Sequence, residues 1–208
     1  MPPHETPRVT GIVLAGGRSR RMGSDKAALA FGGRTLLHHT IAALAEVADE
    51  VVVVRAPGRD LPPFDCQRPV RVVADPVEGE GPLVGIAAGL RAASAPVALV
   101  VAVDMPFLRP ALLRLLAEHA AAGARCVVPI YQGRPQPLCS AWRRDALDVV
   151  QAQIDAGERA VMSVARALDA ERLAPGEWRA ADPDGRSFVN VNTPEEFEAA
   201  QARANDAT

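Results

Sequence analysis

The chain has 208 residues, of which 49% are apolar, and its 23 basic side chains nearly balance 25 acidic ones. This composition is typical of a soluble globular protein, and the lack of a strong positive charge argues against nucleic acid as a partner. The first eight residues lack the pattern of a signal peptide, and the longest apolar stretch, residues 95–103, is half a bilayer span. We therefore expect a cytoplasmic protein that does not enter a membrane.

The length and the cysteine spacing set two further limits. A chain of this size is common for a single α/β unit, so we expect one domain over residues 1–208. Cys66, Cys126 and Cys139 are far apart and form no C-x-x-C pair. This spacing argues against a disulfide framework and a zinc knuckle, and favours ordinary reduced thiols.

Short β-branched runs alternate with longer segments rich in Ala and Leu, which is typical of β-α-β units around a parallel sheet. In the first half, the pattern predicts strands at 9–15, 50–55, 70–75 and 97–104, and helices at 36–48 and 81–94. In the second half, it predicts helices at 109–123, 144–157 and 160–170, and a strand at 125–131 with an antiparallel partner at 137–142.

The last predicted elements are a short strand and a final helix within residues 187–203. Thr193, Pro194 and Glu196 occupy the cap, first and third positions of a capping box at the start of that helix. The terminal segment 204–208 is expected to be frayed.

The segment "LAGGRSRRMGSDK" at residues 14–26 directly follows the first predicted strand. In an open parallel sheet, ligands bind beyond the carboxyl ends of the strands. Gly16 and Gly17 let backbone N–H groups approach an anion, although neither a Walker loop nor G-x-G-x-x-G is present. The four cations of the segment lie within nine residues: Arg18, Arg20, Arg21 and Lys26. A merely solvated patch is the alternative, but these cations repel one another unless an anion is bound, which favours phosphate binding.

Two aspartates follow other predicted strands and belong to the same rim. Asp104 ends an apolar strand, and a charge at that position needs either solvent or a cation. A magnesium ion bridging this carboxylate and substrate phosphates satisfies that need. Asp75 is either a second ligand, a ribose contact or part of an Asp-Pro turn.

No histidine falls in a predicted rim loop. His4 is in the N-terminal segment, His38 and His39 are in one predicted helix, and His119 is in another. Serine and cysteine also lack an evident base, which argues against a catalytic triad. A phosphate nucleophile needs no such base, because its second pKa near about 6 leaves it largely ionised. The sequence thus favours catalysis by positioning and charge neutralisation.

Five segments together resemble the molybdenum cofactor guanylyltransferases, and the resemblance runs from about Gly11 to Phe197. They are "LAGGRSRRMGSDK", "DP...GPLVGI", "AVDMPFL", "AGERAVM" and "FVNVNTPEE". The first is shared with the wider nucleotidyltransferases, and the last points to the molybdenum branch. The resemblance implies a doubly wound, mostly parallel, three-layer α/β/α Rossmann-like fold. It also implies transfer of GMP from GTP to the phosphate of molybdenum-molybdopterin, with release of pyrophosphate.

The resemblance also assigns site residues by position. The nucleotide-binding half would span about 9–108 and the acceptor-binding half about 109–203. Proteins that deliver the cofactor are candidate partners. The nucleotide would meet Leu14, Ala15, Gly16, Gly17, Arg18, Lys26, Asp75 and Asp104. Lys26, Arg21 and Asp104 would be catalytic, with Mg²⁺ on Asp104. Arg18, Arg20 and Arg21 are expected to be phosphate partners because of their charge and placement, apart from the resemblance. The purine side would be shaped by Gly81, Pro82, Leu83 and Gly85.

One position departs from the family pattern, and other assignments stay open. Val54 stands where some members have asparagine, so a polar nucleotide contact is missing or replaced by Arg55. Asn190 and Asn192 either face the pterin or form local backbone hydrogen bonds. Weaker substrate candidates are Arg134, Gln136 and the "AGER" segment at 156–159. The remaining alternatives are cytidylyl transfer to molybdopterin, nucleotidyl transfer to another small phosphate, and nucleotide binding without turnover.

Overall fold

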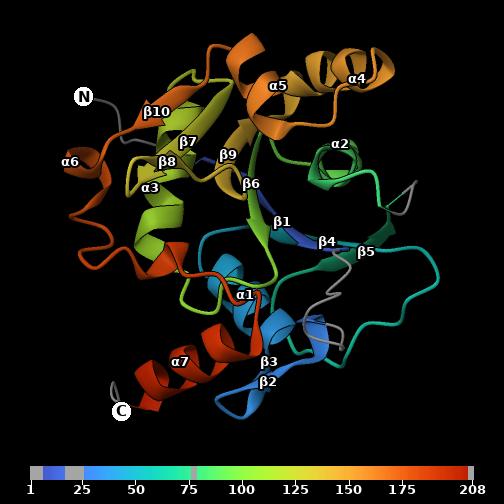
Figure 1. Ribbon diagram of the computed structural model, residues 1–208. Coiled ribbons are helices and arrows are strands. Elements are labelled where there is room, and N and C mark those ends of the chain that lie inside the picture. Colours follow the sequence, from blue (N-terminus) through green and yellow to red (C-terminus); the bar gives the residue numbers. More distant parts are fainter. Residues whose placement is uncertain (1–6, 17–25, 76–78, 206–208) are drawn as a thin grey trace.

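The computed structural model describes residues 7–16, 26–75 and 79–205 (Figure 1). In these residues, one mostly parallel sheet has the strand order β10-β7-β9-β6-β1-β4-β5, and β8 pairs with β7. A separate small hairpin consists of β2 and β3. The strands are β1 (Val9–Ala15), β2 (Ala30–Phe31), β3 (Arg34–Thr35), β4 (Glu50–Arg55), β5 (Val70–Ala74), β6 (Val97–Ala102), β7 (Cys126–Tyr131), β8 (Arg134–Pro135), β9 (Cys139–Arg143) and β10 (Glu171–Leu173).

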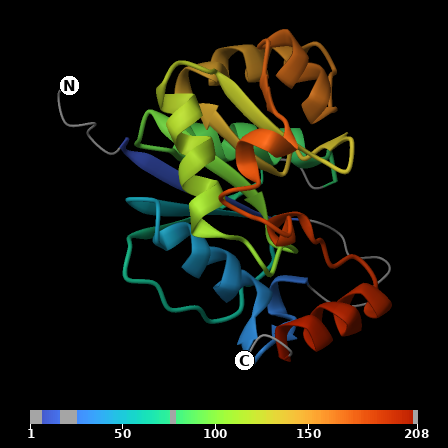
Figure 2. The same cartoon turned by 90° about the vertical axis from the view of Figure 1, so that its left-hand side faces the viewer.

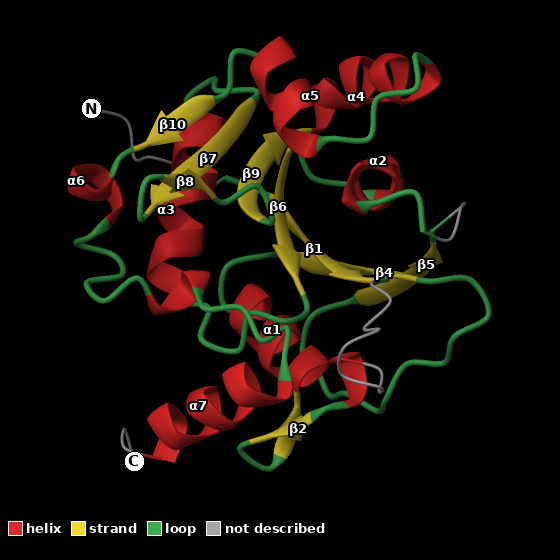
Figure 3. Cartoon of the chain, in the orientation of Figure 1, coloured by secondary structure: helices red, strands yellow, loops and turns green. Residues whose placement is uncertain are grey.

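Helices cover both faces of this sheet, as Figure 3 shows. The α-helices are α1 (Leu36–Ala45), α2 (Pro82–Ala92), α3 (Pro110–Ala121), α4 (Leu147–Asp155), α5 (Val161–Ala167), α6 (Pro175–Trp178) and α7 (Pro194–Asn205). The short 3-10 helices are η1 (Lys26–Ala28), η2 (Arg144–Ala146) and η3 (Arg186–Phe188). One apolar core packs α1 and α3 on one face, and a second packs α2, α4 and α5 on the other. The predicted three-layer α/β/α fold is therefore confirmed.

The central strand β1 explains why both faces are apolar. Val13 packs in the α1 and α3 core, whereas its neighbour Ile12 packs in the α2, α4 and α5 core. Successive side chains of a strand point to opposite faces, so a strand buried on both faces must be apolar throughout. The helix α2 crosses β1 closely at Gly89, where an added Cβ would lie 2.5 Å from Cγ2 of Ile12.

The antiparallel partner predicted in the second half is also confirmed. A tight turn at Gln132 and Gly133, both with positive φ, reverses the chain after β7. The returning strand β9 then enters the sheet between β6 and β7 and is antiparallel to both. Such a turn suits glycine, which adopts positive φ at no steric cost.

The predicted strand at the beginning of 187–203 is wrong. Its backbone donors are used elsewhere: Ser187 N–H donates to Asp182 Oδ2, and Val191 N–H donates to the carbonyl of Asp104. Residues 186–188 instead form η3, and an extended segment leads to α7. A strand requires a ladder partner, and in the described part of the chain no sheet strand pairs with this segment.

The other differences concern element ends. The helix predicted at 144–157 divides into η2 and α4, and the strand predicted at 97–104 ends at Ala102. The final helix α7 extends through Ala204 and Asn205, and the rest of the segment expected to be frayed, 206–208, lies outside the described residues. The structure also contains short elements that the periodicity did not predict, namely β2, β3, β8, β10 and α6.

A buried carboxylate ties the segment after α6 to the start of α3. Asp182 is fully buried, and its oxygens accept hydrogen bonds from the backbone N–H groups of Arg186 and Ser187. Nε of Arg109 lies 3.1 Å from Asp182 Oδ1, and the Arg109 N–H donates to Ser187 Oγ. Because a buried carboxylate needs a counter-charge and hydrogen bonds, this arrangement fixes the path of the chain toward residue 190.

The cysteine and membrane expectations can also be compared with the structure. Cys66, Cys126 and Cys139 are free, and burial, with a smaller effect of Asp182, raises the pKa of Cys139 to about 12. Burial likewise raises the pKa of Cys126, so both stay thiols at neutral pH. Each helix in the described ranges is too short or too polar to cross a lipid bilayer.

Candidate functional site

The carboxyl ends of β1 and β6 mark the place where the sheet reverses its order. After β1, the chain continues to β4 and β5 on one side of it and then returns to β6 on the other side. The ends of the two strands diverge to opposite layers at such a switch point, which leaves room for a ligand. Gly16 directly follows β1, as predicted, whereas Asp104 lies two residues beyond the end of β6 and is not the last residue of that strand.

Three side chains from distant parts of the chain meet beside this switch point. The ammonium of Lys26 donates to Oδ2 of Asp104 at 2.6 Å and to Oδ1 of Asn192 at 2.7 Å. The side chains of Lys26 and Asp104 are 15% and 16% exposed, so solvent reaches the pair without surrounding it. We refer to Lys26, Asp104 and Asn192 as the Lys26 cluster. The structure thus brings together Lys26 and Asp104, which the sequence predicted as partners in one site.

A small apolar core, separate from the two sheet cores, holds these segments together. Phe31 of β2 packs edge-on against Phe107, which follows Asp104, and against Phe197 of α7. The same core includes the buried side chains of Leu36 and Val191. Figures 1 and 2 both show α7 beside the β2–β3 hairpin, away from the sheet layers. This packing fixes the three segments that carry Lys26, Asp104 and Asn192 relative to one another.

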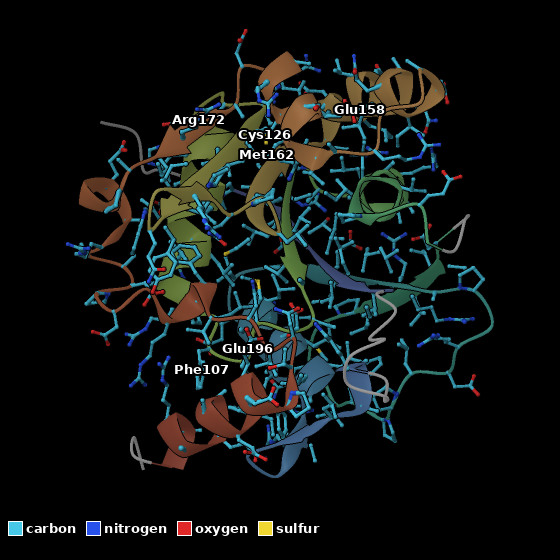
Figure 4. The ribbon with its side chains drawn as sticks, viewed as in Figure 1. Phe107, Cys126, Glu158, Met162, Arg172 and Glu196 are labelled. Carbon is cyan, nitrogen blue, oxygen red and sulfur yellow. The ribbon has the colours of Figure 1, made fainter. Side chains whose placement is uncertain are left out.

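The first turn of α7 fixes the backbone of Asn192. The N–H of Glu196 donates to Oγ1 of Thr193, which confirms Thr193 as the N-cap. The Glu196 carboxylate accepts from the N–H of Asn192 at 2.7 Å, one residue before the cap. Figure 4 labels Glu196 and Phe107, which lie at the α7 end of the molecule. Sequence reasoning found the cap but not the link from Glu196 through Asn192 to Lys26.

The single carboxylate of Asp104 suits a cation that takes most of its ligands from water and substrate phosphates. Among the described residues, no group of three or more His, Cys, Asp or Glu side chains could hold a metal ion. Asp104 is the single carboxylate of the Lys26 cluster, and the hydrogen bond from Lys26 uses its Oδ2. Mg²⁺ is bound in this way in many phosphate sites, by one or two carboxylates, water and substrate phosphates. The residues present therefore fit Mg²⁺ delivered with a polyphosphate, and do not fit a closed all-protein metal site.

A second group of residues converges on the first turn of α2. A Cβ placed on Gly85 would lie 3.3 Å from Cδ2 of Leu14 and 3.8 Å from both Oδ2 of Asp75 and Cγ1 of Val54. The N–H of Asp75 donates to the carbonyl of Arg55, which extends the β4–β5 pairing to the rim. Leu14 of β1, Asp75 directly after β5 and Gly85 of α2 are thus adjacent, although they lie in distant parts of the sequence. The sequence had predicted them separately as nucleotide contacts.

Val54, the residue that departs from the family pattern, is buried in the structure. Val54 is 1% exposed and packs in the α2 core, so this position offers no polar group to a ligand. The guanidinium of Arg55 donates to the carbonyls of Ala56 and Arg59. Arg55 is therefore engaged in its own loop, and the structure does not support it as a replacement for the missing polar contact.

Several other predicted residues lie away from the Lys26 cluster or outside the described residues. Gly17, Arg18, Arg20 and Arg21 are not among the described residues, so their predicted phosphate contacts rest on the sequence. Arg134 is exposed in the β7–β8 hairpin, where its carbonyl accepts from Gln136. Arg159 of the "AGER" segment pairs with Glu80 at 2.8 Å, next to the start of α2. Sequence reasoning missed this ion pair, because the pattern carries no signal that joins residues 80 and 159.

The described histidines all lie in helices and none is in a rim loop, as predicted. His38 and His39 belong to α1, and His119 of α3 contacts Glu171 at 2.7 Å on the opposite part of the sheet. His4 is outside the described residues. The described rim therefore offers carboxylate, ammonium and amide groups for its chemistry.

Comparisons with known proteins identify the family and the fold. A family model described as MobA-like NTP transferase domain matches residues 11–172. A probable molybdenum cofactor guanylyltransferase of Chloroflexus aggregans is 38% identical over 199 residues, which is 93% of this chain and 94% of the relative. A probable molybdenum cofactor guanylyltransferase of Mycobacterium avium is 38% identical over 203 residues, 95% of this chain and 98% of the relative.

Solved structures show the same fold. The molybdopterin-guanine dinucleotide biosynthesis protein A from Archaeoglobus fulgidus is similar with a TM-score of 0.79 and 25% identity, over 95% of this chain and 99% of that one. The 2-C-methyl-D-erythritol 4-phosphate cytidylyltransferase from Thermus thermophilus has a TM-score of 0.70 and 22% identity, over 93% and 98% of the two chains. The extent of the family match and the identity to the guanylyltransferases show that this chain belongs to the MobA-like NTP transferase family of nucleotidyltransferases.

Proposed function

We propose that this chain transfers GMP from GTP to the phosphate of molybdenum-molybdopterin and releases pyrophosphate. The observation that carries the proposal is the Lys26 cluster at the β1–β6 switch point, where an ammonium and a carboxylate meet. Relatives named probable molybdenum cofactor guanylyltransferase, 38% identical over nearly the whole chain, support this choice of substrates. We infer that Leu14, Asp75 and Gly85 receive the nucleoside, because they adjoin one another at the start of α2.

The reaction is an in-line displacement at the α-phosphorus of GTP. An oxygen of the acceptor phosphate forms the new P–O bond, and the bond from the α-phosphorus to the α–β bridging oxygen breaks. The electron pair leaves with pyrophosphate. The acceptor phosphate is largely ionised at neutral pH, so the nucleophile has no proton that a base must remove. This fits a rim without a histidine among the described residues.

The side chains act by positioning and charge. Lys26 holds an ammonium at the rim, where it can stabilise the negative charge that develops on the departing pyrophosphate. Asp104 would hold Mg²⁺, which supplies further charge neutralisation when bound with the triphosphate. Arg18, Arg20 and Arg21 are assigned to the phosphates from the sequence alone.

A panel of nucleoside triphosphates tests this proposal. Pyrophosphate release is measured with GTP, CTP, ATP and UTP and with Mg²⁺, each with and without molybdenum-molybdopterin. We expect release with GTP that requires the pterin. Release with CTP would instead indicate a cytidylyltransferase, and GTP that binds but remains intact after long incubation with the acceptor would indicate a nucleotide-binding protein without turnover.

A further inference from the structure

We propose that Asn192 is the positioning residue of Lys26: its neutral carbonyl holds the ammonium in place when Asp104 binds a divalent cation. This inference rests on the proposed function for the roles of Lys26 and Asp104. It assigns to the segment before α7 a part in nucleotide binding, although residue 192 lies beyond the matched family domain, which ends at residue 172.

The first step concerns the hydrogen bonds of the ammonium. A lysine ammonium has three N–H donors and no acceptor. One donor of Lys26 is used by Oδ2 of Asp104 at 2.6 Å and one by Oδ1 of Asn192 at 2.7 Å. These two hydrogen bonds fix the direction of the third N–H, which can then donate to a phosphate oxygen. The pair of acceptors thus orients the ammonium before a ligand arrives.

The second step concerns the different charges of these two acceptors. A carboxylate that binds a divalent cation has less negative charge to offer an ammonium, and the cation itself repels that ammonium. Asp104 therefore loses part of its hold on Lys26 when the cation binds. The amide of Asn192 is neutral, so it does not attract the cation strongly and can keep its hydrogen bond. It also leaves the positive charge of Lys26 available to the triphosphate, whereas a second carboxylate would neutralise that charge.

The third step concerns how firmly Asn192 is held. Its N–H donates to Glu196 Oε2, and the preceding N–H, of Val191, donates to the carbonyl of Asp104 at 3.0 Å. The side chain of Val191 is fully buried in the small apolar core with Phe31. The backbone that carries the amide is thus tied both to α7 and to the segment after β6. An acceptor fixed in this way loses little conformational entropy when the ligand binds.

A direct role of Asn192 in binding the acceptor substrate predicts different behaviour. A residue that only contacts the pterin would change the KM for the acceptor and leave GTP binding in the absence of the acceptor unchanged. Asn190 is exposed two residues earlier and provides a matched control of the same residue type. The variants needed are therefore Asn192→Ala, Asn192→Asp and Asn190→Ala.

The first measurement uses no acceptor substrate. The side-chain ¹H–¹⁵N signal of the Lys26 ammonium, assigned by its loss in Lys26→Arg, is recorded at low temperature with Mg²⁺ and saturating GTP, and again with GTP and EDTA. We expect a sharp Lys26 signal in the unmodified chain, in Asn190→Ala and in Asn192→Asp, and marked broadening in Asn192→Ala when Mg²⁺ and GTP are both present. An equally sharp signal in Asn192→Ala with Mg²⁺ and GTP would overturn the proposal.

The second measurement is GTP binding by calorimetry without the acceptor. With Mg²⁺, Asn192→Ala should raise the Kd at least tenfold, and in EDTA the increase should be under threefold because Asp104 still holds Lys26. Asn192→Asp should keep the fold and also weaken binding, because it adds a negative charge near the phosphates. Asn190→Ala should match the unmodified chain. An unchanged Kd in Asn192→Ala with Mg²⁺, or equal losses with Mg²⁺ and with EDTA, would overturn the positioning role.

These outcomes are distinguishable from a failure of the proposed function. A chain that binds GTP but transfers no guanylyl group refutes the proposed function, while the ammonium signal and the Mg²⁺-dependent Kd still test Asn192. Thermal unfolding of each variant shows whether a loss of binding comes from a loss of structure. Because Asn192→Asp retains the side-chain oxygen and the backbone bond to Glu196, it remains informative if Asn192→Ala is unstable.

Discussion

Asp104 has two neighbours that depend on it in different ways. Its carboxylate contacts the Lys26 ammonium, and its backbone carbonyl accepts from Val191. A substitution that keeps the backbone and the size of the side chain therefore removes the charge alone. This makes Asp104→Asn a sharper probe of the site than a truncation.

Asp104→Asn should lower kcat for pyrophosphate release by at least about 100-fold, because the loss of one transition-state charge interaction typically costs about 3–4 kcal/mol. The melting temperature should change little, since an amide oxygen can still accept from Lys26. Steady-state kinetics over a range of Mg²⁺ concentrations provide the measurement. The exposed Asp148 is the matched control, and Asp148→Asn should retain full activity. Activity of Asp104→Asn near that of the control would contradict the assignment of this carboxylate.

Lys26 and Asp104 were predictable from the sequence, and Asn192 was predictable only as a candidate. The first two residues follow predicted strands, and the rule that ligands bind at carboxyl ends places both on one rim. The contact between Asn192 and Lys26 joins residues 166 positions apart and depends on how α7 docks on the small apolar core. Local periodicity carries no information about such docking, which explains why Glu196 was predicted as the third position of a capping box and not as a support of the site.

At the scale of elements, the close approach of α2 to β1 is the feature that positions the residues proposed to receive the nucleoside. Leu83, Ile86 and Leu90 of α2 are fully buried against the sheet. The helix can lie this near because Gly89 has no side chain to meet Ile12. The position of α2 in turn sets the position of Gly85, which adjoins Leu14 and Asp75.

Gly89→Ala should destabilise the fold by about 1–3 kcal/mol, as overpacking of a tight core does. The reason is that the new Cβ would lie 2.5 Å from Ile12 Cγ2 and must push α2 outward. Urea unfolding gives the free energy, and the Kd for GTP should rise in parallel because Gly85 moves with the helix. The control is Gly176→Ala in α6, where an added Cβ has nothing within 4 Å. Equal stability of the two variants would show that α2 tolerates the displacement.

The elements themselves were predicted well where burial alone decides them. The spans of β1 and β4 match the prediction, since both are apolar runs in the centre of the sheet. The strand predicted at the start of 187–203 was wrong because polar groups determine the backbone there. The Asp182 carboxylate and the Asp104 carbonyl accept hydrogen bonds from backbone N–H groups that a strand would need. The short elements β2, β3 and β10 span only two or three residues each, too few to establish a period.

At the scale of the whole molecule, Glu50 joins several elements at the end of the sheet opposite the site. It accepts hydrogen bonds from the hydroxyl of Thr10 in β1 and from the N–H and hydroxyl of Ser94 after α2. Arg71 of β5 pairs with its other oxygen at 2.9 Å. Burial alone would raise the pKa of Glu50, but the hydrogen bonds from Ser94, Thr10 and Arg71 outweigh it and lower the pKa to about 2.

This pKa predicts a specific loss of stability in acid. A carboxylate whose pKa is lower in the folded chain stabilises the fold above its unfolded pKa and loses that contribution as the pH falls toward the folded value. The contribution of Glu50 should therefore be complete above about pH 5 and vanish toward pH 2, with a size on the order of 2 kcal/mol. Denaturant unfolding of the unmodified chain and Glu50→Gln at several pH values measures it. The difference in free energy of unfolding between the two should shrink steadily below pH 5, and a constant difference would refute the assignment.

The pairing of β1 with β6 has one more consequence. The ladder between them ends with the Val103 N–H bonded to the carbonyl of Leu14 at 3.2 Å, one residue before Asp104 and two before Gly16. A backbone hydrogen bond therefore links the segment that leads to Gly16 directly to the segment that leads to Asp104, with no side chain as intermediary. The spacing of the two strand ends is thus set by the main chain and does not depend on which side chains follow them.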